Sequence, residues 1–228
     1  MPEKEPSANT RGLSEYDSLC FLQKNGIAIV PPMAIADTPQ KAVEEAEKLG
    51  FPTACKIHSA DIQHKSDVGG VKLNIKNSAE LLEAYKSVTT NAAVKCPGAK
   101  IEGVLVRPML KMGVEMIIGV NNDKQFGPTV MIGMGGVFVE LFKDVQLATA
   151  PVSKKQALKM IESLKAYPLL NGYRGSKPCD VEALAGLLVG ISEIAAKHKD
   201  TIKELDINPV FVTEDGVSIA DALLVEYQ

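Results

Sequence analysis

Hydrophobic and polar residues follow two different periods along this chain, and the change of period predicts its elements. In the segment 71–75, VKLNI, apolar and polar residues alternate as in a half-buried strand. After Asn77, apolar residues instead recur every three or four positions, as on one face of a helix. Such strands and helices alternate in the first half of the chain, whereas the second half mixes antiparallel strands with two helices. We therefore predict an α+β fold with two lobes.

Local signals place the individual elements. Residues that favour the helix N-cap precede each apolar helical pattern, namely Ser14, Thr38, Asn77, Ser153 and Asp180. The first two helices are expected to end at Gly26 and Gly50, and the last two near Ala166 and Lys199. Strands are expected over 27–30, 53–57, 71–75, 102–109, 114–120, 129–136, 207–212 and 217–224, the last two as a hairpin around Asp215-Gly216.

The pattern also divides the chain into segments. Residues 1–12, MPEKEPSANTRG, are polar and charged, so we expect a disordered tail there without the apolar stretch of a secretory signal. A seam near 109–114 separates an expected N-terminal lobe, 13–110, from a C-terminal lobe, 111–228. The most apolar run, 129–142, is shorter than the roughly 20 residues of a membrane-spanning helix. We therefore expect it to form buried strands.

Composition narrows the classes of function. The chain has 228 residues, 46% of them hydrophobic, a formal net charge of −3 and no Trp. A balanced charge and few aromatic residues argue against nucleic acid or an anionic membrane as a partner. The four cysteines are scattered and form no C-x-x-C, which favours free thiols over disulfides or a zinc site. These features predict a cytoplasmic protein.

One stretch combines charge, a nucleophile and glycine. In HKSDVGGV, His64, Lys65 and Asp67 precede Gly69 and Gly70. The segment is compatible with an ordinary polar loop. It is also compatible with a phosphate-binding loop, in which glycine N–H groups approach an anion, Lys65 adds charge and a neutral His64 accepts a phosphoryl group while Asp67 orients it.

Lys56 lies inside the otherwise apolar strand TACKI. It fits either the solvated face of an edge strand or a phosphate-binding cation near the floor of a site. A second glycine cluster, 133–136, follows another apolar strand. It fits either a tight turn or a second backbone contact with phosphate through Gly135 and Gly136, with Glu140 pointing into the same cleft.

Oxygen-bearing side chains gather on the last two expected strands. Asp206 and Asn208 lie in LDINPV, and Asp221 lies in SIADALL. Oxygen ligands on adjacent strands suit Mg²⁺, which proteins hold with one or two side chains plus the phosphates of a substrate. The alternative is an edge hairpin in which Asn-Pro forms a bend.

These motifs occur in a definite order along the chain: K-x₇-HKSDVGGV, EGVLVRPM, FGPTVMIGMGGVFVE, KELDINP and an aspartate on the last strand. Over residues 13–225 this order resembles the beta-type ATP-grasp subunits of the ADP-forming acyl-CoA synthetases, the acetate–CoA ligases that make ATP. The beta subunit of succinyl-CoA synthetase is similar more distantly. The resemblance implies an ATP-grasp fold whose two α+β lobes hold a nucleotide between them.

The resemblance also implies roles for particular residues. Lys56 would contact the phosphates, Glu115 the ribose, and Asn208 and Asp221 would bind magnesium with Asp206 close by. His64 would relay a phosphoryl group. A hinge strand would hydrogen-bond adenine through the backbone of Val104, Leu105, Val106 and Arg107.

The implied reaction is acyl-CoA + ADP + phosphate ⇌ carboxylate + CoA + ATP, running through phosphohistidine with Mg²⁺ and ATP/ADP as cofactors. An alpha subunit would carry the CoA-binding domain and the principal phosphohistidine, in an alpha2beta2 heterotetramer. Two alternatives stay open. One is another ATP-grasp carboxylate ligase that uses an acyl phosphate directly, and the other is a non-catalytic nucleotide-sensing domain.

Overall fold

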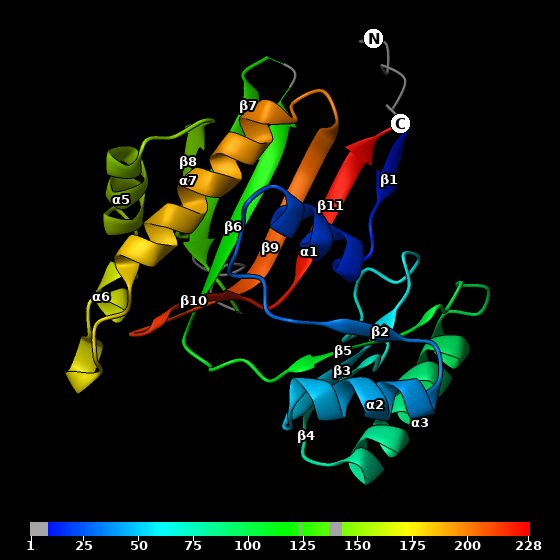
Figure 1. Ribbon diagram of the computed structural model, residues 1–228. Helices are drawn as coiled ribbons and strands as arrows, with labels where there is room; N and C mark the ends of the chain where they lie inside the picture. Colours follow the sequence, from blue (N-terminus) through cyan, green and yellow to red (C-terminus); the bar gives the residue numbers. More distant parts are fainter. Residues whose placement is uncertain (1–8, 124, 137–142) are drawn as a thin grey trace. The chain divides into compact units, whose positions relative to one another are not determined.

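The computed structural model describes residues 9–123, 125–136 and 143–228 (Figure 1). The chain divides into two compact units. The N-terminal unit comprises Ser14–Lys24 and Ala28–Lys111. The C-terminal unit comprises Met112–Gln228, the short piece Asn25–Ile27 and the described residues up to Leu13. This division falls between Lys111 and Met112, one residue beyond the boundary that the sequence suggested.

A four-stranded antiparallel sheet forms the centre of the N-terminal unit. Its strand order is β2-β5-β3-β4. The strands are β2 (Ala34–Ala36), β5 (Gly103–Pro108), β3 (Thr53–His58) and β4 (Val71–Ile75). The helices of this unit are α1 (Glu15–Lys24), α2 (Pro39–Leu49) and α3 (Ser78–Lys95). The predicted helix caps are confirmed here, since the Thr38 and Asn77 side chains accept hydrogen bonds from the N–H groups of Lys41 and Glu80.

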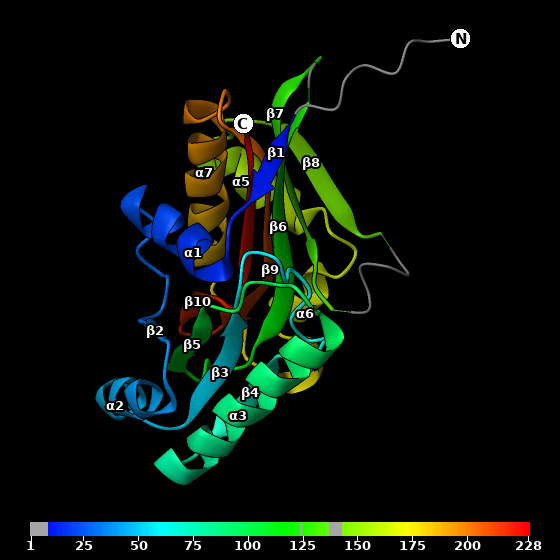
Figure 2. The ribbon, with the colours of Figure 1, turned by 90° about the vertical axis from the view of Figure 1, so that its right-hand side faces the viewer.

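The two faces of this sheet differ in chemistry. Helices α2 and α3 pack side by side, α2 against β5 and α3 against β3 and β4 (Figures 1 and 2). The apolar core under them includes Cys55, Val104 and Val106. Because side chains alternate along a strand, Lys56 and Arg107 point to the opposite face. This face carries the charged residues discussed below.

The strand predicted over 27–30 is wrong. The segment forms a turn, and the strand lies further along the chain at β2. Pro31 and Pro32 separate the two positions. Proline has no N–H to give to a sheet ladder, so pairing with β5 begins only after both prolines have passed.

The C-terminal unit contains a seven-stranded sheet of order β1-β11-β9-β6-β7-β8, with β10 pairing the distal part of β9. Its strands are β1 (Thr10–Gly12), β6 (Val114–Asp123), β7 (Gly127–Met134), β8 (Val145–Thr149), β9 (Ile202–Thr213), β10 (Gly216–Ile219) and β11 (Ala222–Tyr227). Its helical segments are α5 (Lys154–Glu162), α6 (Tyr167–Leu170), the short 3₁₀ turn η1 (Tyr173–Gly175) and α7 (Val181–Lys197).

Helices α5 and α7 cover one face of this sheet, and Figure 1 shows α7 crossing it. Ile118, Val130 and Ile132 are fully buried beneath them. The alternation of side chains sends Glu115 on β6 and Asp206 on β9 to the opposite face, since Met116, Leu205 and Ile207 beside them are buried. The candidate residues of this unit therefore gather on the face that α5 and α7 leave uncovered.

Three predictions about the C-terminal unit need correction. The predicted disordered tail is wrong for Thr10–Gly12, which pair with β11 as strand β1, while residues 1–8 lie outside the described residues. The turn predicted at 121–123 lies later, because β6 runs to Asp123, whose carboxylate accepts hydrogen bonds from the N–H groups of Gln125 and Phe126. The strand predicted over 217–224 is two strands, interrupted at Ala220 and Asp221.

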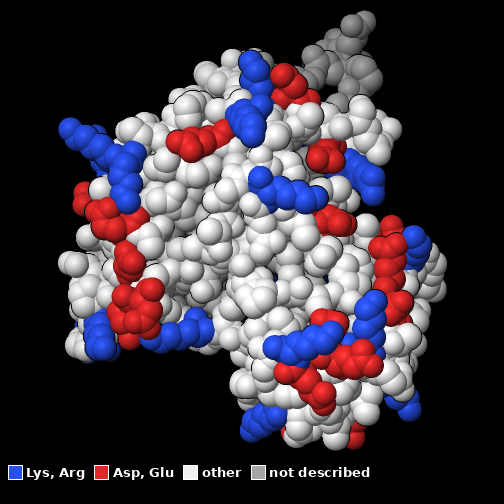
Figure 3. All heavy atoms as spheres, viewed as in Figure 1, with Lys and Arg blue, Asp and Glu red and all other residues white. Residues whose placement is uncertain are grey.

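The visible surface mixes both charges. Figure 3 shows Lys and Arg interleaved with Asp and Glu where α2 lies in the view of Figure 1. Opposite charges also pair on and beside α2, as Lys41–Asp37 at 3.5 Å and Lys48–Glu45 at 2.8 Å. Among the helices that the structure describes, none combines the length and apolar character needed to cross a membrane.

Replacing Gly186 by alanine is expected to stabilise the protein. Gly186 lies in the exposed middle of α7, and a Cβ placed there meets nothing within 4 Å. Glycine in a helix interior costs about 0.5–1 kcal/mol relative to alanine, so Gly186→Ala should raise the free energy of unfolding by about that amount. Urea denaturation measures the change. Gly190→Ala is the comparison, because its Cβ would lie 2.9 Å from Ile27 Cδ1 and the gain should be smaller or lost.

Candidate functional site

A buried cluster of charges lies on the face of the N-terminal sheet opposite α2 and α3. Glu15, at the first position of α1, is 3% exposed, and around it lie Lys56 (8%), Lys65 (8%) and Arg107 (2%). Glu15 Oε1 accepts hydrogen bonds from Lys56 Nζ at 2.6 Å and Arg107 Nη1 at 3.4 Å. Glu15 Oε2 lies 3.2 Å from Lys65 Nζ, without the angle of a hydrogen bond. One carboxylate thus meets three cations.

The cluster fixes the charge of Glu15. Burial by itself raises the pKa of this carboxyl, but Lys56, Lys65 and Arg107 together outweigh it and hold the pKa below its usual range. Glu15 is therefore an anion at neutral pH. The alternative placement of Lys56 on a solvated edge strand is wrong, because β3 lies between β5 and β4 and all six of its residues are buried.

Glu15 is not among the residues predicted for the site, although the sequence contains a signal for it. Glu15, Ser18, Leu19 and Leu22 are the buried residues of α1 and follow the i, i+3, i+4, i+7 spacing of an inward-facing stripe. A carboxylate at the first position of such a stripe must find a charged or hydrogen-bonding partner. Only the folded chain shows that these partners come from β3, β5 and the loop after β3.

The loop 64–70 folds back on β3. Gly70 N–H donates to Lys65 O at 2.8 Å, Gly69 N–H donates to Ser66 O at 3.0 Å, and Gly70 O accepts from Ile57 N–H at 2.7 Å. Both glycine N–H groups are therefore used within the loop, and this conformation does not offer them to phosphate. Lys65 is turned inward to Glu15.

His64 and Asp67 lie on the outer side of this loop. Both are exposed, and the carbonyl of Asp67 accepts a hydrogen bond from Lys95 Nζ at 3.0 Å. Within the part of the chain that is described, no hydrogen bond joins His64 to Asp67. The structure thus leaves His64 accessible to a reactant, while the predicted orienting contact from Asp67 is absent from this conformation.

Replacing Gly70 by alanine is expected to destabilise the N-terminal unit. A Cβ at Gly70 would lie 2.7 Å from Ile57 Cγ2 and 3.1 Å from the backbone oxygen of Lys65. Ile57 is fully buried, so the crowding can be relieved only by moving the loop that carries Lys65. We expect a loss of about 1–3 kcal/mol in the free energy of unfolding. Gly186→Ala, the same chemical change in open space, is the control, and an equal gain at both positions would contradict this account.

The prediction that β5 binds adenine through its backbone needs correction, because this strand is paired on both sides in the sheet. Val104, Leu105 and Val106 pair with β2 on one side of β5 and with β3 on the other. In an antiparallel strand with two neighbours, the backbone N–H and C=O groups are engaged by the ladders. These groups are therefore not free to bind adenine. Arg107, the fourth residue of the predicted hinge, contributes its side chain to the charge cluster instead.

In the C-terminal unit, three predicted nucleotide contacts come together. Gly135 N–H donates to Glu115 O at 2.7 Å. A Cβ on Gly135 would lie 3.0 Å from the backbone carbon of Glu115, and one on Gly136 would lie 3.1 Å from its Oε2. The glycines thus allow the turn after β7 to approach Glu115 closely, and Gly136 has a positive φ of 68°. Glu140 lies outside the described residues.

The three predicted metal ligands also come together. Asp206 and Asn208 are two residues apart on β9 and point to the same face. Asn208 N–H donates to Asp221 O at 3.2 Å, and Leu223 on β11 is the partner of Asp206. The interruption between β10 and β11 brings Asp221 beside Asn208.

The electrostatics of this group suit a cation. Partial desolvation and then the neighbouring carboxylate of Asp221 raise the pKa of Asp206. Two carboxylates that repel each other beside an amide oxygen form the all-oxygen donor set that Mg²⁺ prefers, and a cation would relieve the repulsion. Among the described residues, no group of three or more His, Cys, Asp or Glu side chains is placed to hold a metal, and the two carboxylates here have the amide of Asn208 beside them.

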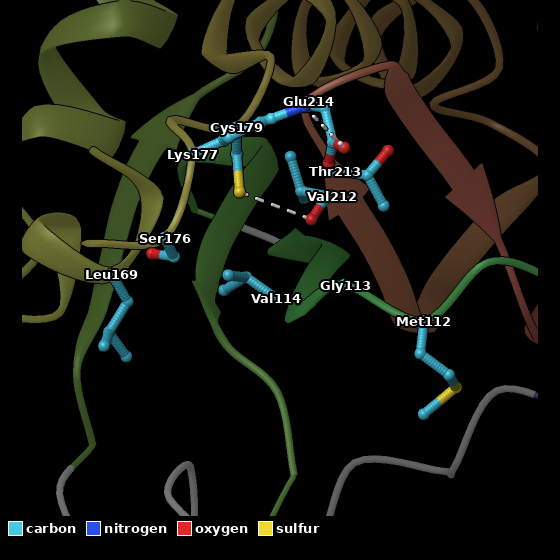
Figure 4. A pocket seen from close by; sticks show the side chains of 10 residues that line it. All are labelled: Met112, Gly113, Val114, Leu169, Ser176, Lys177, Cys179, Val212, Thr213 and Glu214. Carbon is cyan, nitrogen blue, oxygen red and sulfur yellow. Dashed lines mark hydrogen bonds and ion pairs between the residues drawn. The ribbon is translucent and has the colours of Figure 1, made fainter. Parts of the chain in front are cut away.

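A separate pocket of about 320 Å³ lies at the start of β6 (Figure 4). It is lined by Met112, Gly113, Val114, Leu169, Ser176, Lys177, Cys179, Val212, Thr213 and Glu214. Cys179 Sγ donates to Val212 O at 3.4 Å, and burial followed by the Glu214 carboxylate raises the pKa of this thiol. None of the residues predicted for nucleotide or metal lines the pocket. Its thiol stays protonated near neutral pH, which is the less reactive form.

Comparison with known proteins defines the class. A family model described as ATP-grasp domain matches residues 5–225. The acetate–CoA ligase [ADP-forming] I subunit beta of Pyrococcus furiosus is 44% identical over 222 residues, 97% of this chain and 95% of the relative. The match covers both units, so the chain is an α+β ATP-grasp protein.

Solved structures agree with this assignment. A complex of Ca. Korarchaeum cryptofilum dinucleotide forming acetyl-coenzyme A synthetase 1 with coenzyme A, Ca-AMPCP and HgCl+ superposes with a TM-score of 0.91 at 42% identity, covering 95% of this chain and 93% of that one. A second complex of this synthetase, with coenzyme A and Mg-AMPPCP and its phosphohistidine segment pointing towards the nucleotide binding site, gives 0.83 at 39% identity over the same shares. The chain belongs to the ATP-grasp family that includes the beta subunits of ADP-forming acetate–CoA ligases.

Proposed function

We propose that this chain is the nucleotide-binding beta subunit of an ADP-forming acyl-CoA synthetase of the acetate–CoA ligase type. The reaction is acyl-CoA + ADP + phosphate ⇌ carboxylate + CoA + ATP. The observation that carries the proposal is the match, at 44% identity over 97% of the chain, to a protein that is itself such a beta subunit. The candidate residues lie within residues 5–225, the range that the family model matches.

The residues divide the work of binding. Lys56, Lys65 and Arg107 supply positive charge for the phosphates, and Glu115 contacts the nucleotide on the face of the C-terminal sheet. Asp206, Asn208 and Asp221 hold Mg²⁺, whose chemistry is to neutralise charge on the phosphates. Phosphoryl transfer depends mainly on such positioning and neutralisation, so these residues need no covalent role.

The covalent step belongs to histidine. An alpha subunit carries the CoA-binding domain and the principal phosphohistidine, and we expect an alpha2beta2 assembly in the cytoplasm. His64 of this chain relays the phosphoryl group. Its neutral imidazole attacks phosphorus of the alpha phosphohistidine and releases that histidine, and attack by a terminal oxygen of ADP then forms ATP and regenerates His64. The exposure of His64 on its loop supports this role.

Radiolabelled phosphate tests the proposal. The chain is combined with its alpha partner and incubated with ATP labelled at the γ-phosphate, and acid-labile, base-stable label on histidine is followed in both subunits. We expect label on alpha that depends on Mg²⁺ and is returned to ADP. His64→Ala should slow this exchange by at least tenfold, while Ser66→Ala, an exposed change in the same loop, should leave it intact.

The outcomes separate the candidates. Full exchange in His64→Ala would remove the relay role and leave the subunit assignment in place. Label that never reaches alpha, together with turnover of a carboxylate and an amine or thiol through an acyl phosphate, would identify a direct ATP-grasp ligase. Nucleotide binding without turnover with any alpha partner would mean a sensing domain.

A further inference from the structure

Glu15 is the feature of the charge cluster that the predicted site does not include. Its carboxylate lies in the middle of the cluster, within 2.6 Å of Lys56, 3.2 Å of Lys65 and 3.4 Å of Arg107. It reaches this place because α1 begins at Glu15 and turns its buried stripe inward. Two strands, one loop and one helix thus meet at a single anion.

Backbone pairing fixes the positions from which the side chains of Lys56, Lys65 and Arg107 extend. In the register of β3 and β5, Lys56 is the partner of Leu105 and Ala54 is the partner of Arg107, so Lys56 and Arg107 are diagonal neighbours on one face. Lys65 is held nearby because its carbonyl accepts from Gly70 N–H and Gly70 O accepts from Ile57 N–H on β3. Their long side chains reach Glu15 from these fixed points, and each contact with its carboxylate helps to set the direction of the side chain.

Three cations brought together at low exposure repel one another, and a central anion offsets that repulsion. A charge-assisted hydrogen bond is short and directional, as the 2.6 Å contact of Lys56 is. The anion therefore also restricts the rotamers of these lysines before a ligand binds. Cations ordered in advance bind a phosphate chain at lower entropic cost.

We propose that Glu15 is a positioning residue for nucleotide phosphates, whose carboxylate orders Lys56, Lys65 and Arg107 so that they bind the phosphate chain of ADP or ATP. The inference rests on the proposed function, because it assumes that these cations face a nucleotide. The ligand class is a nucleoside di- or triphosphate. Glu15 itself does not touch the ligand, and its effect passes through the cations.

A series of adenine nucleotides tests this role. Calorimetric titration with AMP, ADP and ATP in the presence of Mg²⁺ compares the full chain with Glu15→Gln, which keeps the shape of the side chain and removes its charge. We expect the dissociation constants of ADP and ATP to rise roughly tenfold, and that of AMP less than twofold. Glu15→Asp, which keeps the charge on a shorter side chain, should recover part of the loss.

The matched control is Glu45→Gln. It is the same chemical change in the N-terminal unit, at a carboxylate on α2 that pairs with Lys48 at 2.8 Å. It should leave all three affinities unchanged. Thermal unfolding of each variant sets a measuring temperature at which it is folded. If Glu15→Gln is unfolded there, Glu15→Asp alone is tested, with the same expected dependence on the number of phosphates.

The results are decisive in either direction. An equal loss for AMP, ADP and ATP would mean that Glu15 only maintains the fold, and an unchanged or tighter affinity for ATP would mean that it does not order the cations for phosphate. Either result overturns the inference. If the unchanged protein bound none of the nucleotides, alone or with its alpha partner, the proposed function itself would be wrong. This result differs from a failure of the Glu15 inference, in which the unchanged protein binds nucleotides but the variants do not show the expected pattern.

Discussion

Asp221→Ala is expected to remove most of the magnesium-dependent nucleotide binding of this protein. Asp221 is one of three oxygen-bearing residues that β9 and the segment before β11 bring together, and its backbone carbonyl accepts from Asn208 N–H. Loss of residues that merely orient metal ligands already costs 10–100-fold in affinity or activity, so losing a ligand should cost on the order of 100-fold. Calorimetric titration with ADP and ATP, with and without Mg²⁺, measures the effect.

The control for this substitution lies on the same sheet. Glu204 is an exposed carboxylate on β9, two residues before Asp206, and it pairs with Lys203 at 3.1 Å. Glu204→Gln removes a negative charge from the same region without touching the three candidate ligands. It should change the affinity less than twofold. If Glu204→Gln and Asp221→Ala weakened binding equally, the loss of any negative charge in this region would explain the effect. The assignment of Asp221 as a magnesium ligand would then be wrong.

Glu15→Ala is expected to cost about 3–5 kcal/mol of unfolding free energy, the largest stability effect we predict. The substitution leaves Lys56, Lys65 and Arg107 close together at low exposure without the carboxylate that they share. Breaking a buried ion pair by removing one partner is costly because the remaining charge stays desolvated. Urea denaturation at neutral pH measures the loss.

The pH dependence gives a second test of this prediction. The cations hold the pKa of Glu15 below its ordinary value of 4.5 in the folded protein. A lowered folded-state pKa means that the stabilisation is fully present above the unfolded value and is lost as pH falls through the folded value. The difference in stability between the unchanged protein and Glu15→Ala should therefore be constant near neutral pH and shrink below about pH 4.5.

A half-buried carboxylate on the surface of α2 provides the contrast. Glu45→Ala breaks the Lys48–Glu45 contact on the surface of α2, and ion pairs between neighbouring turns of a surface helix contribute about 0.5 kcal/mol or less. Its effect should also fade in salt, because solvent-exposed charges are screened. A loss at Glu15 no larger than that at Glu45 would show that the charge cluster is not energetically important.

Local signals in the sequence predicted most of the helices and strands. Thr38 predicts the start of the second helix and Gly50 its end, and α2 runs from Pro39 to Leu49, because both signals act within a few residues of the helix ends. Ser153 and Asp180 cap α5 and α7 as predicted, with their side chains accepting from Gln156 and Ala183 N–H. Caps are local interactions, so the capping residues can be predicted from the sequence without knowledge of the tertiary structure.

Errors arose where a distant partner decided the outcome. Thr10–Gly12 are polar and looked disordered, but β11, more than two hundred residues away, offers them an edge to pair with. The resemblance in motif order predicts that the backbone of Val104–Val106 binds adenine. Pairing with β2 and β3 occupies their backbone, and no property of the stretch itself reveals that it has two neighbours.

The sequence by itself determined the class of this protein, the magnesium candidates and the histidine loop, because each depends on the order of motifs along the chain. Only the tertiary structure decided what Lys56, Lys65 and Arg107 contact. Their shared partner, Glu15, lies 41 and 92 residues away from Lys56 and Arg107 along the chain. Charge acts through space rather than along the sequence, so a carboxylate in the first helix and three separate cations become one cluster only after the sheet has formed.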